Sequence, residues 1–368
     1  MRILRDCEIL SPAGPTLGRR LKLAAKPRPT AADIARLAGV GVATVDRVLN
    51  GRAPVRKETV DRVREAAEHL GYHALPLIRR RATARIANVR LGFVLQKQAD
   101  PFYQNVAAVL RREFSCRPEV NGKVEIVFVD DISAKSLGEK ISEVGIRTDA
   151  VACVAIEHPL VVQAVDELNL RGKPVFTLLS GISARGITGY IGLDSRKVGR
   201  TGAFIIAKMA RAEGKIATLV GSHRYRGQEL SEIGFRSYFR DIGEEARLLE
   251  TIVNLDDPEV AREVTTSLLD RHVDLAAIYD AGGGRDGIIQ AIRSHGSGLR
   301  PVVVCNDLTG ATRSALIDGI ITCVLCLPVE AFARAVIDEM VASIIGVRPV
   351  APNRTLPFDV IFAENLPS

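Results

Sequence analysis

From residue 89 onward, short apolar runs alternate with longer amphipathic ones, and no other feature of the sequence limits the fold as strongly. The run Val89 to Leu95 predicts a buried strand, and Asn105 to Phe114 has the apolar spacing of a helix. Further strands are expected at residues 123–129, 150–156, 174–179, 216–220, 249–253, 275–279, 302–305 and 322–325, and further helices at 136–144, 160–170, 198–210, 229–240 and 258–270. Such alternation is typical of parallel sheets covered by helices, with ligands at the carboxyl ends of the strands.

Charge is unevenly distributed along the chain, whose 368 residues carry a formal net charge of +7. Residues 1–87 contain 18 Lys and Arg against 8 Asp and Glu, a net charge of +10. The remaining 32 Lys and Arg against 35 Asp and Glu give −3. A basic N-terminal quarter on a mildly acidic body is typical of a nucleic-acid-binding module carried by a soluble domain.

The basic segment begins with a short amphipathic helix and a tight turn. Residues 33–38 have Ile34, Leu37 and Ala38 spaced to form one inner face. Thr30 stands where an N-cap is expected, because its hydroxyl can accept from a free N–H of the first turn. Gly39 then ends the helix, since glycine adopts positive φ at no steric cost.

A second helix is expected from about Val42, and a third from Arg56 to Leu70. Apolar residues at three- and four-residue spacing give each helix an inner face: Val45, Val48 and Leu49 in the second, Val60, Val63, Ala67 and Leu70 in the third. Five residues of the second helix point away from this core: Val42, Ala43, Thr44, Arg47 and Asn50. The arrangement predicts a helix-turn-helix whose second helix fits a DNA major groove.

Three stretches together resemble the headpiece of the lactose-repressor (LacI/GalR) family. They are Asp33-Ile-Ala-Arg-Leu-Ala-Gly-Val, Ala43-Thr-Val-Asp-Arg-Val-Leu-Asn-Gly and His69-Leu-Gly-Tyr. The resemblance implies an all-α headpiece joined to an α/β body of two parallel-sheet lobes, similar to a periplasmic binding protein. The expected divisions are an N-terminal extension at 1–27, the headpiece at 28–73, a hinge at 74–88 and a bilobed effector-binding and dimerisation domain at 89–368.

The resemblance also implies a function. We expect a cytoplasmic, ligand-responsive regulator of transcription, a repressor in the family's commoner mode, that binds a palindromic double-stranded operator as a homodimer. A sugar or related polar metabolite would bind between the lobes. The residues expected at the DNA are Thr30, Val42, Ala43, Thr44, Arg47, Asn50, Arg56, Arg79, Arg80 and Arg81.

The hinge departs from the family's pattern. The proline–asparagine opening of the family is absent, and arginines occupy the stretch in which the family places a leucine in the minor groove. Leu77 and Ile78 are the nearby apolar candidates for that wedge. The arginines themselves suit phosphates or a narrow minor groove.

The expected effector contacts are Asp100, Phe102, Tyr103, Ser180, Arg226, Asp280 and Asp307. In relatives of the ribose-binding type, the positions of Phe102 and Tyr103 carry aromatics that stack on the sugar, and that of Asp307 carries an aspartate for its hydroxyls. Other polar groups of the family are replaced here, by Leu179-Ser180, Ser231, Ala281 and Cys326. A pocket that loses several hydrogen-bonding groups does not keep the same ligand. The alternative is that Phe102 and Tyr103 only pack the core.

Two other functions remain open. Gly282-Gly-Gly284-Arg-Asp-Gly287 fits a dinucleotide fingerprint and has Asp307 downstream, which would suit an NAD(P)-dependent enzyme. A secreted solute-binding protein would fit the body alone. Against both, the glycine motif falls late in the strand–helix series, and the first 25 residues lack the apolar core of a signal peptide.

The remaining residue types favour no cofactor, no catalytic group and no metal. The six histidines form no ligand-like cluster, and no Ser-His-Asp grouping is specific enough to name. Four of the six cysteines lie in expected strands, which favours buried reduced thiols over a disulfide framework. Cys323 and Cys326 would face opposite sides of a strand, and no segment approaches the ~18 apolar residues of a membrane span.

Overall fold

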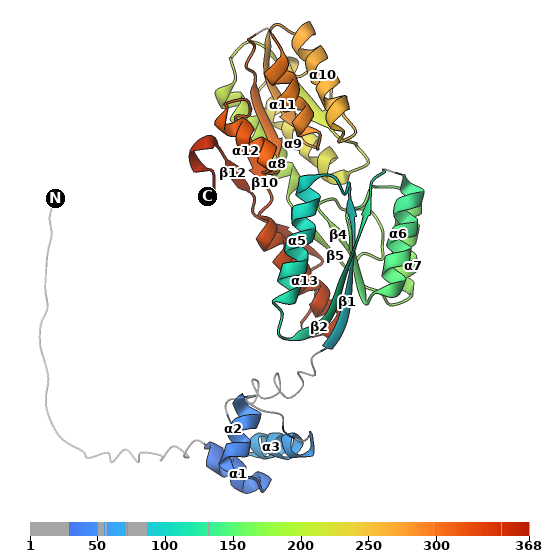
Figure 1. Ribbon diagram of the computed structural model, residues 1–368, viewed down its shortest axis with the longest axis vertical. Helices are drawn as coiled ribbons and strands as arrows, with labels where there is room; N and C mark the ends of the chain where they lie inside the picture. The colour runs from blue at the N-terminus through green and yellow to red at the C-terminus, as the bar shows by residue number, and fades with distance from the viewer. Residues whose placement is uncertain are drawn as a thin grey trace, which may run out of the picture. The chain divides into compact units, whose positions relative to one another are not determined.

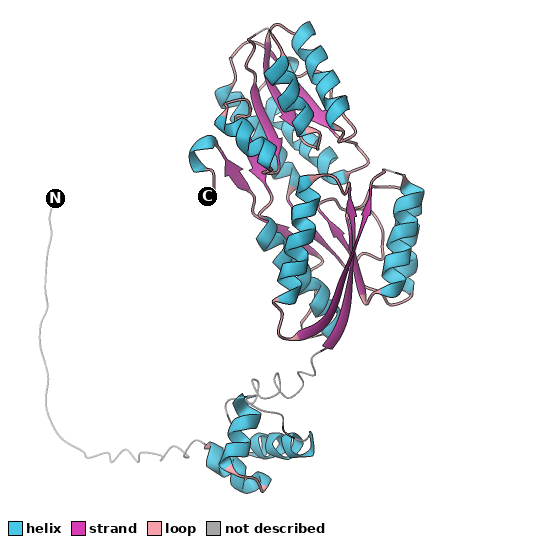
Figure 2. Ribbon diagram, in the orientation of Figure 1, coloured by secondary structure: helices cyan, strands magenta, loops and turns pink. Residues whose placement is uncertain are grey.

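The computed structural model describes residues 29–50, 55, 57–70, 72, 87–131, 133–296, 298–346 and 348–367, and contacts divide the chain into two units, Met1–Arg85 and Ile86–Ser368. The described part of the first unit is helical, and the second is an α/β body (Figure 1). Figure 2 shows the same division by secondary structure. The helices and strands expected from the sequence are present in both units.

The first unit, the headpiece, consists of α1 (Ala31–Ala38), α2 (Val42–Asn50) and α3 (Lys57–His69). Thr30 and Asp33 form a capping box at the start of α1, each side chain bonded to the other residue's backbone N–H. Gly39 ends the helix with φ 63°, in the left-handed conformation that favours glycine. The core contains side chains of all three helices, among them Ile34, Val45 and Val63.

One expectation for α1 is wrong. Leu37 was assigned to the inner face, but 52% of its surface is exposed. The buried residues are Ile34, Ala35 and Ala38, so the inner face is centred between Ile34 and Ala35. At 3.6 residues per turn, Leu37 lies roughly 100° away from that centre.

The body contains two lobes, each built on a six-stranded sheet. The first lobe contains β1 (Ala87–Gln96), α5 (Pro101–Ser115), β2 (Val120–Val129), α6 (Ala134–Arg147), β3 (Ala150–Cys153), α7 (Pro159–Leu170), β4 (Val175–Leu178), β5 (Gly189–Leu193), α13 (Val329–Ile345) and β11 (Asn353–Leu356). Its strand order is β11-β5-β4-β3-β1-β2, and all pairs are parallel. Helices α5 and α13 pack together, as do α6 and α7 (Figure 1).

The second lobe contains α8 (Ser195–Met209), β6 (Lys215–Val220), α9 (Arg226–Asp241), η1 (Glu245–Arg247), β7 (Ile252–Val253), α10 (Pro258–Arg271), β8 (Leu275–Asp280), α11 (Arg285–Ser294), β9 (Val302–Asn306), α12 (Gly310–Ile317), β10 (Cys323–Cys326), β12 (Asp359–Ile361) and η2 (Ala363–Asn365). Its strand order is β12-β10-β9-β8-β6-β7, parallel except for the edge strand β12. One apolar cluster joins α8 and α9 to the sheet. A second apolar cluster joins α10, α11 and α12 to it.

Side-chain caps explain where many helices of the body begin. Residues with short polar side chains accept hydrogen bonds from free N–H groups of the first turn. These N-caps are Asp100, Ser133, Asp194, Asp257 and Thr309. The caps place α5, α10 and α12 directly after loops that follow strand ends, on the side of the sheets where ligands were expected.

The chain passes between the lobes three times, and this was not expected from the sequence. The passages follow β5, β10 and β11, so α13 and β11 return to the first lobe. Glu339 of α13, 2% exposed, accepts hydrogen bonds from Arg348 and Arg354 and so ties β11 to the helix.

The run at 249–253, expected to be a full strand, forms only the two-residue edge strand β7. No helix among the described residues is long and apolar enough to cross a membrane.

Candidate functional site

A cavity of about 150 Å³ lies between the two lobes of the body. Its wall includes Gln96, the last residue of β1, and Leu193, the last residue of β5. From the second lobe it includes Ala281, directly after β8, and Asn306, the last residue of β9. The cavity therefore lies at the carboxyl ends of the strands of both sheets, where the sequence predicted a ligand site.

A buried arginine joins the lobes across this cavity. Arg285, the first residue of α11, lies 3.3 Å from Asp100 of the first lobe and 3.4 Å from Asp307 of the second. Only 5% of the Arg285 side chain is exposed, so a high-dielectric solvent does not screen these pairs. Burial raises the pKa of Asp307 to about 6. The charge of Arg285 lowers this pKa, whereas the negative charges of Asp100 and Asp256 raise it further.

Lys97 makes a second contact across the cavity. Its ammonium donates to the backbone carbonyls of Leu255 and Asp256, at 2.9 and 2.8 Å. All three residues have positive φ, at 41°, 59° and 51°, a conformation that costs non-glycine residues energy. Backbone hydrogen bonds from Glu157 to Arg224 and from Gly227 to the hydroxyl of Ser180 also join the lobes, so the cleft is closed.

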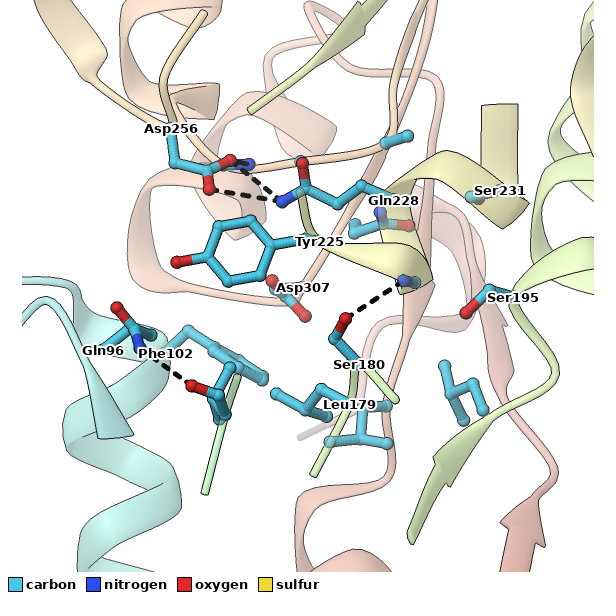
Figure 3. A pocket seen from close by; sticks show the side chains of 18 of the residues that line it. Gln96, Phe102, Leu179, Ser180, Ser195, Tyr225, Gln228, Ser231, Asp256 and Asp307 are labelled. Carbon is cyan, nitrogen blue, oxygen red and sulfur yellow. Dashed lines mark hydrogen bonds between the residues drawn. The ribbon is translucent and has the colours of Figure 1, made fainter. Parts of the chain in front are cut away.

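Asp256 is fixed by uncharged groups. Its carboxylate accepts from the side-chain amide of Gln228, at 3.2 Å to each oxygen, and from the backbone N–H of Gly283 (Figure 3). A Cβ at Gly221 would lie 1.8 Å from that carboxylate, and one at Gly282 would lie 2.6 Å from it. The glycines therefore make room for Asp256 beside the cavity.

Aromatic side chains form part of the apolar wall. The rings of Phe102 and Tyr103 meet edge to face, with centroids 5.1 Å apart. Tyr225 approaches from the second lobe, and Figure 3 shows its ring beside Asp307 and Asp256. Burial raises the pKa of Tyr103 well above its usual value, and the charges of Asp256, Asp307 and Asp100 add to this effect.

Five of the seven effector contacts expected from the sequence line the cavity: Asp100, Phe102, Tyr103, Ser180 and Asp307. Asp280 and Arg226 are not part of its wall. Asp280 is fully buried behind it. One carboxylate oxygen accepts from Gly282, the other has no hydrogen-bond partner among the described residues, and burial raises the pKa of Asp280 to about 8. Among the replaced family positions, Leu179, Ser180, Ser231 and Ala281 line the cavity, whereas Cys326 does not.

The sequence did not single out Lys97, Gln228, Asp256 or Arg285, which line the cavity as well. One signal was available for Arg285, because it follows the glycine turn at 282–284 that was expected at the cleft. Lys97 and Asp256 follow strands β1 and β7, as Asp100 and Asp307 follow β1 and β9. The position of Gln228, two residues into α9, carries no such signal.

Contacts within the protein explain the glycines of the dinucleotide-like motif at 282–287. Gly284 has φ 81° and opens α11. A Cβ at Gly287 would lie 1.8 Å from the carbonyl oxygen of Pro258, so this glycine allows α10 and α11 to pack closely. A Cβ at Gly282 would lie 2.6 Å from a carboxylate oxygen of Asp256, and a Cβ at Gly283 would lie 3.1 Å from the Cβ of Asp256, so both glycines make room for this residue. Internal packing thus explains each glycine without a bound pyrophosphate.

In the headpiece, the outer face of α2 carries the residues expected at DNA. Val42 is 51% exposed, Ala43 and Arg47 are exposed, and Thr44 is half-buried. Thr30 differs from them, because its hydroxyl is engaged with Asp33 in the cap of α1. The predictions for the Asn50 side chain and for Arg56, Arg79, Arg80 and Arg81 lie outside the described residues.

The cysteines and possible metal ligands add no second site. Cys153, Cys305, Cys323 and Cys326 are buried free thiols in strands, as expected, and Cys116 is exposed. Within the described ranges, no group of three or more His, Cys, Asp or Glu side chains is arranged to hold a metal ion.

Two families match the sequence. Residues 92–346 match the family described as periplasmic binding protein domain, and residues 30–74 match bacterial regulatory proteins, lacI family. The chain is 27% identical over 222 residues to an uncharacterized HTH-type transcriptional regulator of Streptomyces limosus, covering 58% of this chain and 59% of that relative. It is 43% identical over 74 residues to the HTH-type transcriptional regulator GalR of Salmonella typhimurium, which is 20% of this chain and 21% of that one. The chain thus spans less than two thirds of either relative.

Solved structures resemble the body. An ABC transporter solute-binding protein of Agrobacterium vitis, bound with α-D-tagatopyranose, has a TM-score of 0.69 and 18% identity, covering 76% of this chain and 96% of that chain. Another from Burkholderia graminis, in complex with D-arabinose, has a TM-score of 0.69 and 19% identity, covering 76% and 97%. At these identities the likeness concerns the fold.

Proposed function

Because the chain belongs to the periplasmic binding protein domain family and carries an N-terminal domain of the lacI family of bacterial regulatory proteins, we propose that it regulates transcription in response to a small ligand. The relatives named above are transcriptional regulators, which supports this function over an enzymatic one. The observation that carries the proposal is a closed interlobe cavity in the same chain as a helix-turn-helix with an exposed second helix.

The proposed regulator works in the cytoplasm, binds double-stranded DNA through α2 and binds its effector between the lobes. A single headpiece buries too little surface for high specificity, so the proposal includes a homodimer on a near-palindromic operator. Repression is the commoner mode of the family and is our choice. The effector is a sugar or related polar metabolite, in keeping with the polar groups and aromatic rings of the cavity.

Selection of genomic fragments by the full-length protein tests the DNA-binding part of the proposal. Sequencing of the retained fragments should reveal a short motif with two-fold symmetry, and the genes beside it would indicate the effector. Failure to enrich any motif over the input DNA, or a strictly monomeric protein at DNA-binding concentrations, would contradict the proposal. Micromolar binding of NAD or NADP would favour the enzyme, and a periplasmic location would favour the solute-binding protein.

Arg47 is expected to read a base. It is an exposed cation on the outer face of α2, where Val42 and Ala43 can touch only thymine methyl groups. Replacing Arg47 with Ala should weaken specific binding by about 1–3 kcal/mol and relax the preference at one base pair per half-site. Fluorescence anisotropy with single-base operator variants measures both effects. Arg36→Ala on α1, also exposed, serves as the matched control, and equal losses on specific and random DNA would make Arg47 a phosphate contact instead.

The linker arginines are expected to act on affinity and not on sequence preference. Replacing Arg79, Arg80 and Arg81 with Ala should reduce the slope of log affinity against log salt concentration. If each arginine contacts one phosphate in a dimer, the slope falls by up to about five units, at ~0.9 per phosphate. The ratio of specific to random binding should change much less. Titrations at several salt concentrations measure the slope, and an unchanged slope would mean that these side chains stay solvated.

A further inference from the structure

The charged side chains that line the cavity carry an excess of negative charge. Three carboxylates, Asp100, Asp256 and Asp307, stand against two cations, Lys97 and Arg285, which leaves one negative charge. Aromatic rings and aliphatic side chains form much of the remaining wall, and they do not screen this charge as water would. A bound ligand experiences that excess directly.

Neither cation is available to an acidic ligand. Arg285 lies between Asp100 and Asp307, and the ammonium of Lys97 already donates to two carbonyls. Asp256, in contrast, receives only uncharged donors within the described part of the chain, from Gln228 and Gly283. Among the described residues, the cavity therefore offers a carboxylate that forms no ion pair, and both of its cations already have partners.

The pKa values of neighbouring titratable groups are affected by the same excess of negative charge. Burial and then the charge of Asp256 raise the pKa of Asp280 to about 8, which keeps this acid protonated at neutral pH. The pKa of Tyr103 is raised by burial, and the three cavity carboxylates add to that rise. Asp280 and Tyr103 are thus harder to ionise than in water, as expected beside an uncompensated negative charge.

The aromatic rings point to the same ligand chemistry. Tyr103 and Tyr225 belong to the cavity wall, and the negative face of an aromatic ring attracts a cation. The cavity volume is about 150 Å³, so the ligand is compact. Ser180 and Ser195 add hydroxyl groups that can bond to hydroxyls of the ligand.

We propose that the ligand of this cleft is a compact hydroxylated amine, such as an amino sugar or an amino polyol, bound as its cation. The proposal rests on the proposed function, in which the cleft binds the effector, and it adds the charge of that effector. It sets this cleft apart from one that takes neutral sugars, sugar acids or sugar phosphates.

A charge-matched panel tests the proposal on the full-length protein. Glucosamine, galactosamine, mannosamine and amino alditols are compared with the parent sugars and alditols, with the uronic acids and with the 6-phosphates, by thermal shift and calorimetry. In the series that fits, the amine should bind at least about 10-fold more tightly than its neutral parent, and the acid about 100-fold more weakly, as expected for a unit charge a few ångströms away. The proposal is overturned if the parent or the acid binds as tightly as the amine, or if no amine of the panel binds.

Two isosteric variants locate the charge that is responsible. Asp256→Asn and Asp307→Asn should each bring the amine-to-parent affinity ratio towards one, with less effect on the parent itself. Asp241→Asn, at the exposed end of α9, removes the same charge far from the cavity and should leave the ratio unchanged. Equal ratios in all three variants would reject the assignment. Selection of a DNA motif by the headpiece does not depend on these results, so the proposed function can stand if the ligand class fails.

Discussion

Replacing Arg285 with methionine should lower the free energy of unfolding of the body by about 3–5 kcal/mol, the usual cost of breaking a buried ion pair. Methionine keeps much of the side-chain volume but leaves Asp100 and Asp307, each about one fifth exposed, without their shared cation. Their mutual repulsion then opposes closure of the lobes. Urea titration of the full-length protein, followed by circular dichroism of the body's transition, measures the loss.

A second arginine of α11 provides a matched control for the replacement of Arg285. Arg293 of α11 pairs with Asp318 at 2.6 Å, but both side chains are about half exposed. Because solvent screens such a pair, Arg293→Met should cost less than about 1 kcal/mol. Adding Asp307→Asn to Arg285→Met removes one of the orphaned charges and should restore part of the loss. Similar losses for Arg285→Met and Arg293→Met would contradict the buried role of Arg285.

Replacing Lys97 with methionine should shift the cleft towards an open state and weaken ligand binding by about 10- to 100-fold. Two charge-assisted hydrogen bonds to the carbonyls of Leu255 and Asp256 hold the lobes together, and each is worth about 1.5–3 kcal/mol. In an open cleft water would satisfy the same groups, so the stability of each lobe changes little. The apparent affinity falls because the binding-competent population falls.

Single-molecule energy transfer can follow this opening. Dyes on cysteines placed at Lys135 of α6, which is exposed, and at Arg262 of α10, whose side chain is 42% exposed, report on the distance between lobes. The exposed Cys116 is replaced by Ser. Lys173→Met is the control, because Lys173 donates to the carbonyl of Thr148 within the first lobe. The interpretation fails if Lys97→Met and Lys173→Met give the same distance distribution and the same ligand affinity.

Local patterns predicted the parts of this fold that depend on local physics. The cap formed by Thr30 and Asp33, and the left-handed turn at Gly39, follow from short-range hydrogen bonding and steric freedom. Asp100 and Asp307 were expected at the effector cleft from the resemblance to ribose-type binding proteins, whose ligands bind at the carboxyl ends of parallel strands. Both line the cavity.

Other features depend on contacts that no local pattern encodes. The pairing of Arg285 with Asp100 joins positions far apart in the chain, and the contact of Lys97 with Leu255 requires the lobes to close. Helix α13 lacks a clear polar face, because apolar residues on all its sides, such as Phe332, Ile337 and Ala342, are buried. Its sequence therefore carried no amphipathic period, and its return to the first lobe could not be expected from the order of elements.

The return of α13 and β11 has a consequence for synthesis of the chain. The first lobe begins with β1 at Ala87, yet its core contains Phe332, Val336 and Met340 of α13, and β11 pairs with β5 at its edge. During translation at ~5–20 residues per second, the segment from Leu193 to Val329 takes on the order of ten seconds to emerge. For that time the nascent first lobe has an unfilled apolar face beside α5 and an unpaired strand edge at β5. All of the second lobe except β12 and η2 is synthesised within that interval, so the lobe begun first must wait for most of the second before it can close its own core.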